Sequence, residues 1–166
     1  MRVALEGKTI VITGASSGIG AATAHACIDS GMHCVINARR KDKLRLLAKE
    51  LGENCLVVEG DVTEVGFNQH LLDESGDVYA IFANAGHGLN QTMVDCNMDQ
   101  LEELFKLNVF AAIELATLGA KKMVTNKSGH ILLCASCLSK FATPKHGVYS
   151  ASKSALESMG IKAILG

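Results

Sequence analysis

The sequence has 166 residues, of which 48% are apolar, with one proline and no tryptophan, and this predicts one well-packed globular domain over 1–166. The net charge is −1, from 16 basic and 17 acidic residues, and no basic cluster with interleaved aromatic residues is present, so we expect no nucleic-acid partner. No apolar run approaches the ~18 residues that span a bilayer, and residues 1–8 lack the apolar core of a signal peptide. We expect a cytoplasmic protein with no membrane partner.

Short β-prone runs alternate with helical stretches along the chain. The predicted strands cover residues 9–13, 33–37, 55–59, 78–83 and 130–134. The predicted helices cover residues 18–30, 41–51, 65–74 and 98–125, and a last helix begins near residue 148. This alternation predicts βαβ units and therefore an α/β fold, a doubly wound parallel sheet in three layers. Ligands on such sheets bind where the carboxyl ends of the strands meet, near the switch point.

A glycine-rich turn lies between the first strand and the first helix, with the sequence Thr13-Gly14-Ala15-Ser16-Ser17-Gly18-Ile19-Gly20. Glycine permits a tight turn and lets the backbone come close to a phosphate. The N-terminus of the following helix adds free N–H groups and the positive end of a dipole. The spacing Gly-x3-Gly-x-Gly differs from GxGxxG, but its position after a first strand favours phosphate binding over an ordinary turn.

The second strand ends without the acidic residue that would bind the adenosine ribose of NAD. The sequence there is Asn37-Ala38-Arg39-Arg40. Arginine suits the 2′-phosphate of NADP, so this position predicts NADP, with NAD the less favoured cofactor. The alternative is the solvated basic start of a helix, because Lys41 and Lys43 follow.

Polar residues also follow the later strands. Asp61-Val62 and Asn84-Ala85-Gly86 could border a cofactor, or they could be a helix cap and a turn. Asn108 lies inside the long predicted helix, where asparagine is a mediocre helix former, so it could bond a buried group or a water. Ser136 follows the fifth strand, and its hydroxyl could bond a substrate carbonyl or belong to a turn.

Tyr149 and Lys153 lie four residues apart in the last predicted helix, so they share a face. A phenol is a poor acid–base catalyst near neutral pH, because it ionises near pH 10. A cation beside it favours the phenolate, and the pair could therefore act as a general acid or base on a carbonyl or alcohol. Such a pair alone also arises on solvated helices, and the other motifs decide between the two interpretations.

The six cysteines fit reduced side chains in a reducing compartment. Cys134-Ala135-Ser136-Cys137 is a CxxC motif, which can indicate redox chemistry or a metal. A zinc site would need a second ligand pair at short spacing, and a thioredoxin-like motif would begin a helix near the first strands. We therefore predict no metal site.

Taken together, these residues resemble the short-chain dehydrogenase/reductase family. The resemblance covers essentially the whole sequence and depends on the order Thr13-Gly14-x3-Gly18-x-Gly20, Asp61, Asn84-Ala85-Gly86, Asn108, Ser136 and Tyr149-x3-Lys153. It implies a Rossmann-like fold and an NAD- or NADP-dependent oxidoreductase that interconverts an alcohol and a carbonyl. The substrate would then be a small-molecule carbonyl or alcohol.

The resemblance also implies a role for each matched residue. Tyr149 exchanges a proton with the substrate oxygen, Lys153 favours the phenolate and bonds the nicotinamide ribose, and Ser136 orients the substrate. Asn108 holds a water that links Lys153 to solvent. The residues implied to bind the cofactor are Gly14, Ser16, Ser17, Gly18, Ile19 and Gly20 in the turn, Arg39 and then Arg40 at the 2′-phosphate, and Asp61, Val62, Asn84, Ala85 and Gly86 at its border.

Two departures from the family pattern stand out. The usual Asn-Asn-Ala-Gly reads Ala83-Asn84-Ala85-Gly86 here. Family members run to roughly 250 residues as one domain, so this sequence corresponds to the pattern as far as the fifth strand and the following helix. The alternative function is therefore a catalytically inactive truncated form that binds only nucleotide or a partner subunit. The helices 98–125 and 148–164 correspond to the usual dimer surface of the family, which implies a homo-oligomer.

Overall fold

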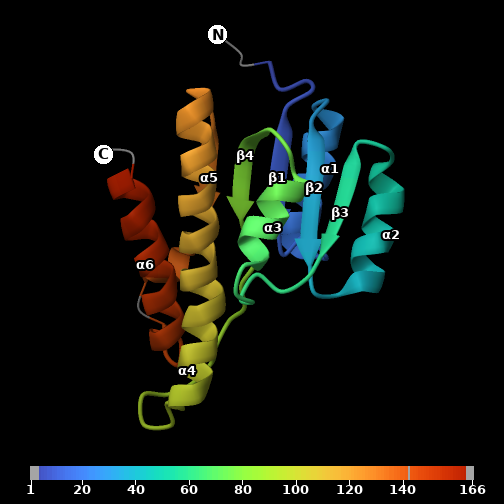
Figure 1. Ribbon diagram of the computed structural model, residues 1–166. Coiled ribbons are helices and arrows are strands. Elements are labelled where there is room, and N and C mark those ends of the chain that lie inside the picture. Colours follow the sequence, from blue (N-terminus) through green and yellow to red (C-terminus); the bar gives the residue numbers. More distant parts are fainter. Residues whose placement is uncertain (1–3, 142, 164–166) are drawn as a thin grey trace.

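The computed structural model describes residues 4–141 and 143–163. Five parallel strands form one sheet in the order β3-β2-β1-β4-β5, of which Figure 1 labels β1 to β4. They are β1 (Thr9–Thr13), β2 (His33–Ala38), β3 (Cys55–Glu59), β4 (Val78–Ala83) and β5 (His130–Leu133). The chain moves outward from β1 to β3 and then crosses to β4 on the other side of β1. The switch point therefore lies between β1 and β4.

Helices cover both faces of the sheet, which gives the three predicted layers. They are α1 (Gly18–Asp29), α2 (Lys41–Leu51), α3 (Phe67–Glu74), α4 (Met98–Phe105), α5 (Ala112–Asn126) and α6 (Gly147–Ala163). Alternate strand residues point to opposite faces. Ile10 and Ile12 pack with α1 and α2, whereas Val11 belongs to a second core formed with α3, α5 and α6. The predicted α/β fold is confirmed.

The predicted boundaries hold to within about two residues, but the long predicted helix 98–125 is not uniform. A π-helical segment, Lys106–Ala111, separates α4 from α5. π-Helical turns inside helices frequently lie at functional sites, and this one carries Asn108. The structure also adds a 3₁₀ turn over Cys137–Ser139, which the sequence did not indicate.

β5 forms one edge of the sheet, and its residues Ile131 and Leu132 are 36% and 48% exposed. An apolar, unpaired strand edge is a surface that proteins usually cover.

Over the residues that the structure describes, no helix is long and apolar enough to cross a membrane. The final residue of the predicted helix 148–164 lies outside the described residues.

Candidate active site

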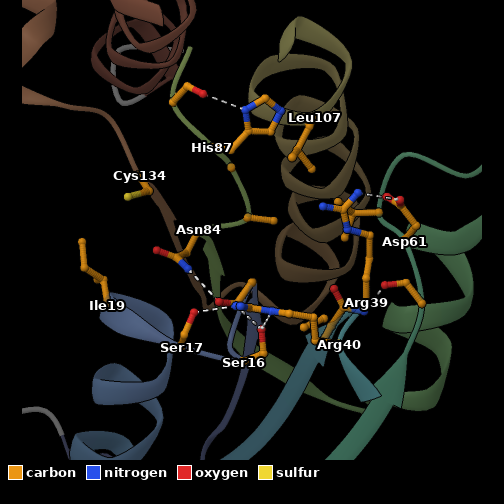
Figure 2. Close-up of a pocket in the computed structure, with 18 of the residues that line it drawn as sticks. Ser16, Ser17, Ile19, Arg39, Arg40, Asp61, Asn84, His87, Leu107 and Cys134 are labelled. Carbon is orange, nitrogen blue, oxygen red and sulfur yellow. Dashed lines mark hydrogen bonds and ion pairs between the residues drawn. The ribbon is translucent and has the colours of Figure 1, made fainter. Parts of the chain in front are cut away.

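A cavity of about 500 Å³ opens at the carboxyl ends of the strands, at the switch point. Most of the predicted site residues line it: Gly14, Ser16, Ser17, Ile19, Arg39, Arg40, Asp61, Val62, Asn84, Ala85, Gly86, Tyr149 and Lys153. Figure 2 shows Arg39, Arg40 and the serines of the glycine-rich turn converging on this space. Residues from the first third of the chain and from α6 therefore share one cavity.

The glycine-rich turn packs directly on the segment that follows β4. A Cβ atom at Gly14 would lie 2.8 Å from the Cα of Ala85, and one at Gly20 would lie 2.7 Å from the Gly14 carbonyl oxygen. Gly14 also has a φ of +66°, which favours glycine. Both positions therefore require glycine so that the two strand ends can touch.

Thr13 holds these two segments together with its side chain. Its hydroxyl accepts the backbone N–H groups of Asn84 and Ala85, each at 3.1 Å. The Asn84 amide in turn donates to the carbonyl of Thr13 at 3.0 Å and to that of Gly14 at 3.4 Å. The asparagine therefore has a structural role at the rim of the cavity, whatever the cavity binds.

Arg40 lies against the serine hydroxyls of the glycine-rich turn (Figure 2). Its Nη2 donates to Ser16 Oγ at 2.8 Å and to Ser17 Oγ at 2.6 Å, and its Nε donates to Ser16 Oγ at 3.1 Å. These partners are uncharged, so the guanidinium charge is not neutralised. A cation with two hydroxyls and an adjacent helix N-terminus is suited to an anion such as a phosphate.

Arg39 points to a different partner, Asp61, with 3.5 Å between Nη1 and Oδ2 (Figure 2). Asp61 also accepts from the backbone N–H and the hydroxyl of Thr63, at 2.9 and 2.8 Å. Burial opposes the ionisation of Asp61, but the hydrogen bonds from Thr63 and the charge of Arg39 outweigh it and lower its pKa. Asp61 is therefore an anion that caps its own turn and pairs with Arg39.

Asn108 is fully buried in the π-helical segment and links three parts of the chain. Its Oδ1 accepts the His87 N–H at 3.0 Å, and its Nδ2 donates to the His87 carbonyl at 2.9 Å and to Ser152 Oγ at 3.2 Å. A Cβ at Gly86 would lie 2.9 Å from Asn108 Oδ1 and 3.4 Å from Lys153 Nζ. Gly86 therefore makes room for two of the predicted catalytic residues.

Tyr149 and Lys153 occupy the same face of α6, as their spacing predicts, with Lys153 Nζ 6.0 Å from the centre of the tyrosine ring. Lys153 is 4% exposed, and its ammonium donates to the Cys134 carbonyl at 2.6 Å. Burial lowers the pKa of Lys153, while the neighbouring Cys134 side chain acts in the opposite direction. The cation therefore lies beside the phenol, at the wall of the cavity.

Ser136 is held at the start of the 3₁₀ turn, where its Oγ accepts the Leu138 N–H at 3.2 Å. This contact fits the alternative in which Ser136 belongs to a turn, and Ser136 is not among the residues that line the cavity. Its hydroxyl acts here as an acceptor, so its single hydrogen can still be donated to another group.

The comparisons with known proteins identify the family of this chain. Residues 8–162 match the family model described as short chain dehydrogenase. The chain belongs to the short chain dehydrogenase family. It is 32% identical over 162 residues to an uncharacterised oxidoreductase of Listeria monocytogenes, covering 93% of this chain and 65% of that protein. The chain thus spans less than two thirds of the length of this relative.

Solved structures of short chain dehydrogenases have the same fold. A short chain dehydrogenase/reductase from Burkholderia phymatum, in complex with NAD, superposes with a TM-score of 0.93 at 28% identity, covering 98% of this chain and 60% of that one. The closed form of a serine dehydrogenase, complexed with NADP+, superposes with a TM-score of 0.89 at 22% identity, covering 93% and 64%. The second likeness shows the fold alone.

Four predicted residues of this short chain dehydrogenase are not among those that line the cavity: Gly18, Gly20, Asn108 and Ser136. The cavity also has lining residues that the sequence analysis did not select: Asn37, Ala38, Gly60, His87, Gly88, Leu107 and Cys134. Most of these residues end a strand or directly follow one, so their position at a strand end is the sequence feature that could have identified them. Leu107 has no such signal, because its position depends on the packing of the π-helical segment.

Among residues 4–141 and 143–163, no three His, Cys, Asp or Glu side chains are placed to share a metal ion.

We predict that Gly20→Ala destabilises the protein by about 2 kcal/mol, because the new methyl group would overlap backbone atoms of Gly14 and the Asn84 amide. Gly88→Ala is the matched control, since no heavy atom lies within 4 Å of a Cβ built there. Urea denaturation of both variants measures the difference. Equal unfolding midpoints would contradict the close packing between the turn and the segment after β4.

Proposed function

We propose that the chain is an NADP-dependent oxidoreductase that interconverts an alcohol and a carbonyl by hydride transfer, with Tyr149 as the general acid or base. The observation that carries this proposal is that Tyr149 and Lys153 line the same cavity as the glycine-rich turn and the two arginines. A proton-transfer group and an anion-binding turn are thereby brought together. The chain spans 65% of the length of its Listeria relative, so the activity is proposed from the residues of this chain.

The residues of the cavity fit a dinucleotide. The turn brings its backbone against Ala85, and Ser16, Ser17 and Arg40 present hydrogen-bond donors to the opening beside it. Gly14, Ser16, Ser17, Gly18, Ile19 and Gly20 would hold the pyrophosphate. Asp61, Val62, Asn84, Ala85 and Gly86 would border the cofactor, and Lys153 would bond the nicotinamide ribose. When bound, the nicotinamide supplies the hydride.

Preference for NADP over NAD rests on Arg39 and Arg40. Both line the cavity, and both guanidinium groups can bond a phosphate in two places. Asp61 follows β3 and is paired with Arg39, so it is not an acid at the end of β2. One similar solved structure holds NAD and another holds NADP+, and cofactor choice is therefore argued from these side chains.

The proton transfer is assigned to Tyr149 with help from its neighbours. Lys153 places a buried ammonium near the phenol and is oriented by the Cys134 carbonyl. Asn108 uses its whole amide on His87 and Ser152, which supports a role in positioning α6 against the cavity. Ser136 would donate its hydroxyl hydrogen to the substrate oxygen, because its Oγ is already the acceptor for Leu138.

The alternative is a catalytically inactive form that binds only nucleotide or a partner subunit. The feature that favours it is the exposed apolar edge of β5, because relatives of this chain have additional length that could cover such an edge. The two proposals differ in turnover, and they agree on nucleotide binding unless the inactive form binds only a partner subunit. They are therefore separated by one pair of measurements.

We predict that Tyr149→Phe reduces turnover at least about 100-fold, because it removes the hydroxyl that exchanges the proton. The assay is NADPH consumption by the 166-residue chain with small ketones, aldehydes and quinones. NADPH binding, followed by its fluorescence, should be retained in the variant. Binding without turnover in the unmodified chain supports the inactive form, and absence of NADPH binding contradicts both the oxidoreductase and an inactive form that binds nucleotide.

Cofactor choice is tested with Arg39→Ala and Arg40→Ala. We predict that each variant weakens NADPH binding about 10-fold while changing NADH binding little, because a charge-assisted hydrogen bond to the 2′-phosphate is lost. Titration calorimetry with both nucleotides gives the comparison. Lys43→Ala serves as the control, since this lysine lies on α2 and does not line the cavity. Equal weakening of both nucleotides would refute the role in 2′-phosphate binding.

We also propose a homo-oligomer formed through residues 98–125 and 148–164. Phe110 in the π-helical segment and Val124 on α5 are 62% and 76% exposed, so both side chains are available at the surface for contact with a second chain. We predict that light scattering gives a mass of at least two chains and that Phe110→Asp shifts it to one chain. A monomeric unmodified protein would contradict this surface as an interface.

A further inference from the structure

Three cysteines from different elements meet at the end of the sheet opposite the cavity. Cys27 belongs to the last turns of α1, Cys34 is near the start of β2, and Cys55 begins β3. Cys34 and Cys55 are direct partners in the strand register, and all three side chains belong to the core beneath α1 and α2. The proposed oxidoreductase reaction uses none of them, and they are separate from the CxxC motif.

The side chain of Cys34 points at the helix that carries Cys27. Its Sγ lies 3.6 Å from the carbonyl oxygen of Ala24. Ala24 and Cys27 are three residues apart on α1 and share a face. The turn after α1 brings the chain straight back, because the Met32 N–H donates to the Cys27 carbonyl at 3.0 Å. Cys27 and Cys34 are therefore neighbours in space across a short loop.

The two thiols differ in the properties that matter for redox chemistry. Cys34 is buried, whereas Cys27 is half-buried and reachable from solvent. The neighbouring Cys34 side chain favours the thiolate of Cys27, and although burial opposes this, the pKa of Cys27 falls to about 7. The neighbouring Cys27 side chain and burial raise the pKa of Cys34, and burial raises the pKa of Cys55 to about 11. Cys27 therefore ionises more readily than Cys34, which retains its proton more strongly.

We propose that Cys27 and Cys34 are a peroxide-reactive thiol pair, in which a hydroperoxide oxidises Cys27 and Cys34 then closes a disulfide. The juxtaposition of an accessible and a buried thiol on α1 and β2 carries this proposal. A soft metal ion is the other chemistry that clustered thiols suggest, but within the described ranges no three such side chains are arranged to bind one. The proposal is independent of the oxidoreductase activity.

The disulfide forms in two steps, oxidation of Cys27 and then attack by Cys34. The Cys27 thiolate attacks the peroxide, so an S–O bond forms and the O–O bond breaks, and the leaving oxygen takes a proton to become water or an alcohol. Cys27 becomes a sulfenic acid, which is a two-electron oxidation, and the peroxide is reduced. The Cys34 sulfur then attacks the Cys27 sulfur, so the S–S bond forms, the S–O bond breaks, and the departing hydroxide takes the Cys34 proton to become water.

Peptide mapping tests the pair directly. The reduced full-length chain is treated with hydrogen peroxide, its remaining thiols are blocked with N-ethylmaleimide, and trypsin digestion follows. Cys27 and Cys34 lie on one tryptic peptide, 9–39, whereas Cys55 lies on 50–106. We predict that peptide 9–39 loses two hydrogens and both of its maleimide labels. A cross-link between the two peptides, or unchanged labelling of 9–39, would overturn the proposal.

Two variants separate the roles of the thiols. Cys34→Ser should accumulate a sulfenic acid on Cys27 that dimedone traps, because the resolving thiol is gone. Cys27→Ser should leave Cys34 reduced and without dimedone adduct. Cys137→Ser is the matched control and should oxidise at 9–39 as the unmodified chain does, because Cys137 is exposed and lies outside the trio. Dimedone on Cys34 in place of Cys27 would contradict the assignment, and the mapping of the unmodified chain stands even where a variant does not fold.

Discussion

The Thr13 side chain fixes the distance between the carboxyl ends of β1 and β4, and the cavity depends on that distance. Its hydroxyl accepts two backbone N–H groups from the segment after β4, while Asn84 returns hydrogen bonds to the end of β1. Because Gly14 has no side chain, the two segments can touch at Ala85. These hydrogen bonds hold the rim of the cavity in place without a ligand, which would lower the ordering cost of binding one.

Asn108 connects this rim to Tyr149 and Lys153, the pair proposed to transfer a proton. It connects the backbone at His87 to Ser152, the residue that precedes Lys153 on α6. The π-helical segment provides the local widening in which this buried amide finds partners on two sides. An orphaned amide at this depth would be costly, so its three hydrogen bonds hold α6 in one position relative to the cavity. The orientation of Tyr149 thus depends on a residue that does not line the cavity.

The sequence predicted the elements well because their signals are local. Apolar strands that alternate with helices, glycine-terminated helices and a glycine-rich turn are all patterns among residues close together in the chain. The observed strands and helices begin and end within about two residues of the predicted bounds. The π-helical segment was missed because its sequence is compatible with an ordinary helix. Thr13 and Leu107 were not selected as site residues because their roles depend on contacts with distant segments. The positions of Tyr149 and Lys153 in one cavity with the turn could be expected only from the motif order, not from composition or spacing.

Arg39 and Arg40 are adjacent in the chain but are prepared differently for an anion. Arg40 is bonded to neutral hydroxyls, so an incoming phosphate would meet an uncompensated charge and two further donors. Arg39 is paired with Asp61 and would have to exchange one anion for another. Breaking the ion pair with Asp61 costs little free energy, because the Arg39 side chain is 66% exposed and exposed ion pairs contribute about 1 kcal/mol or less. The negative charge of Asp61 would repel a phosphate that is not itself contacted by Arg39. A phosphate bound by Arg39 and Arg40 together would therefore be favoured over one bound by Arg40 alone.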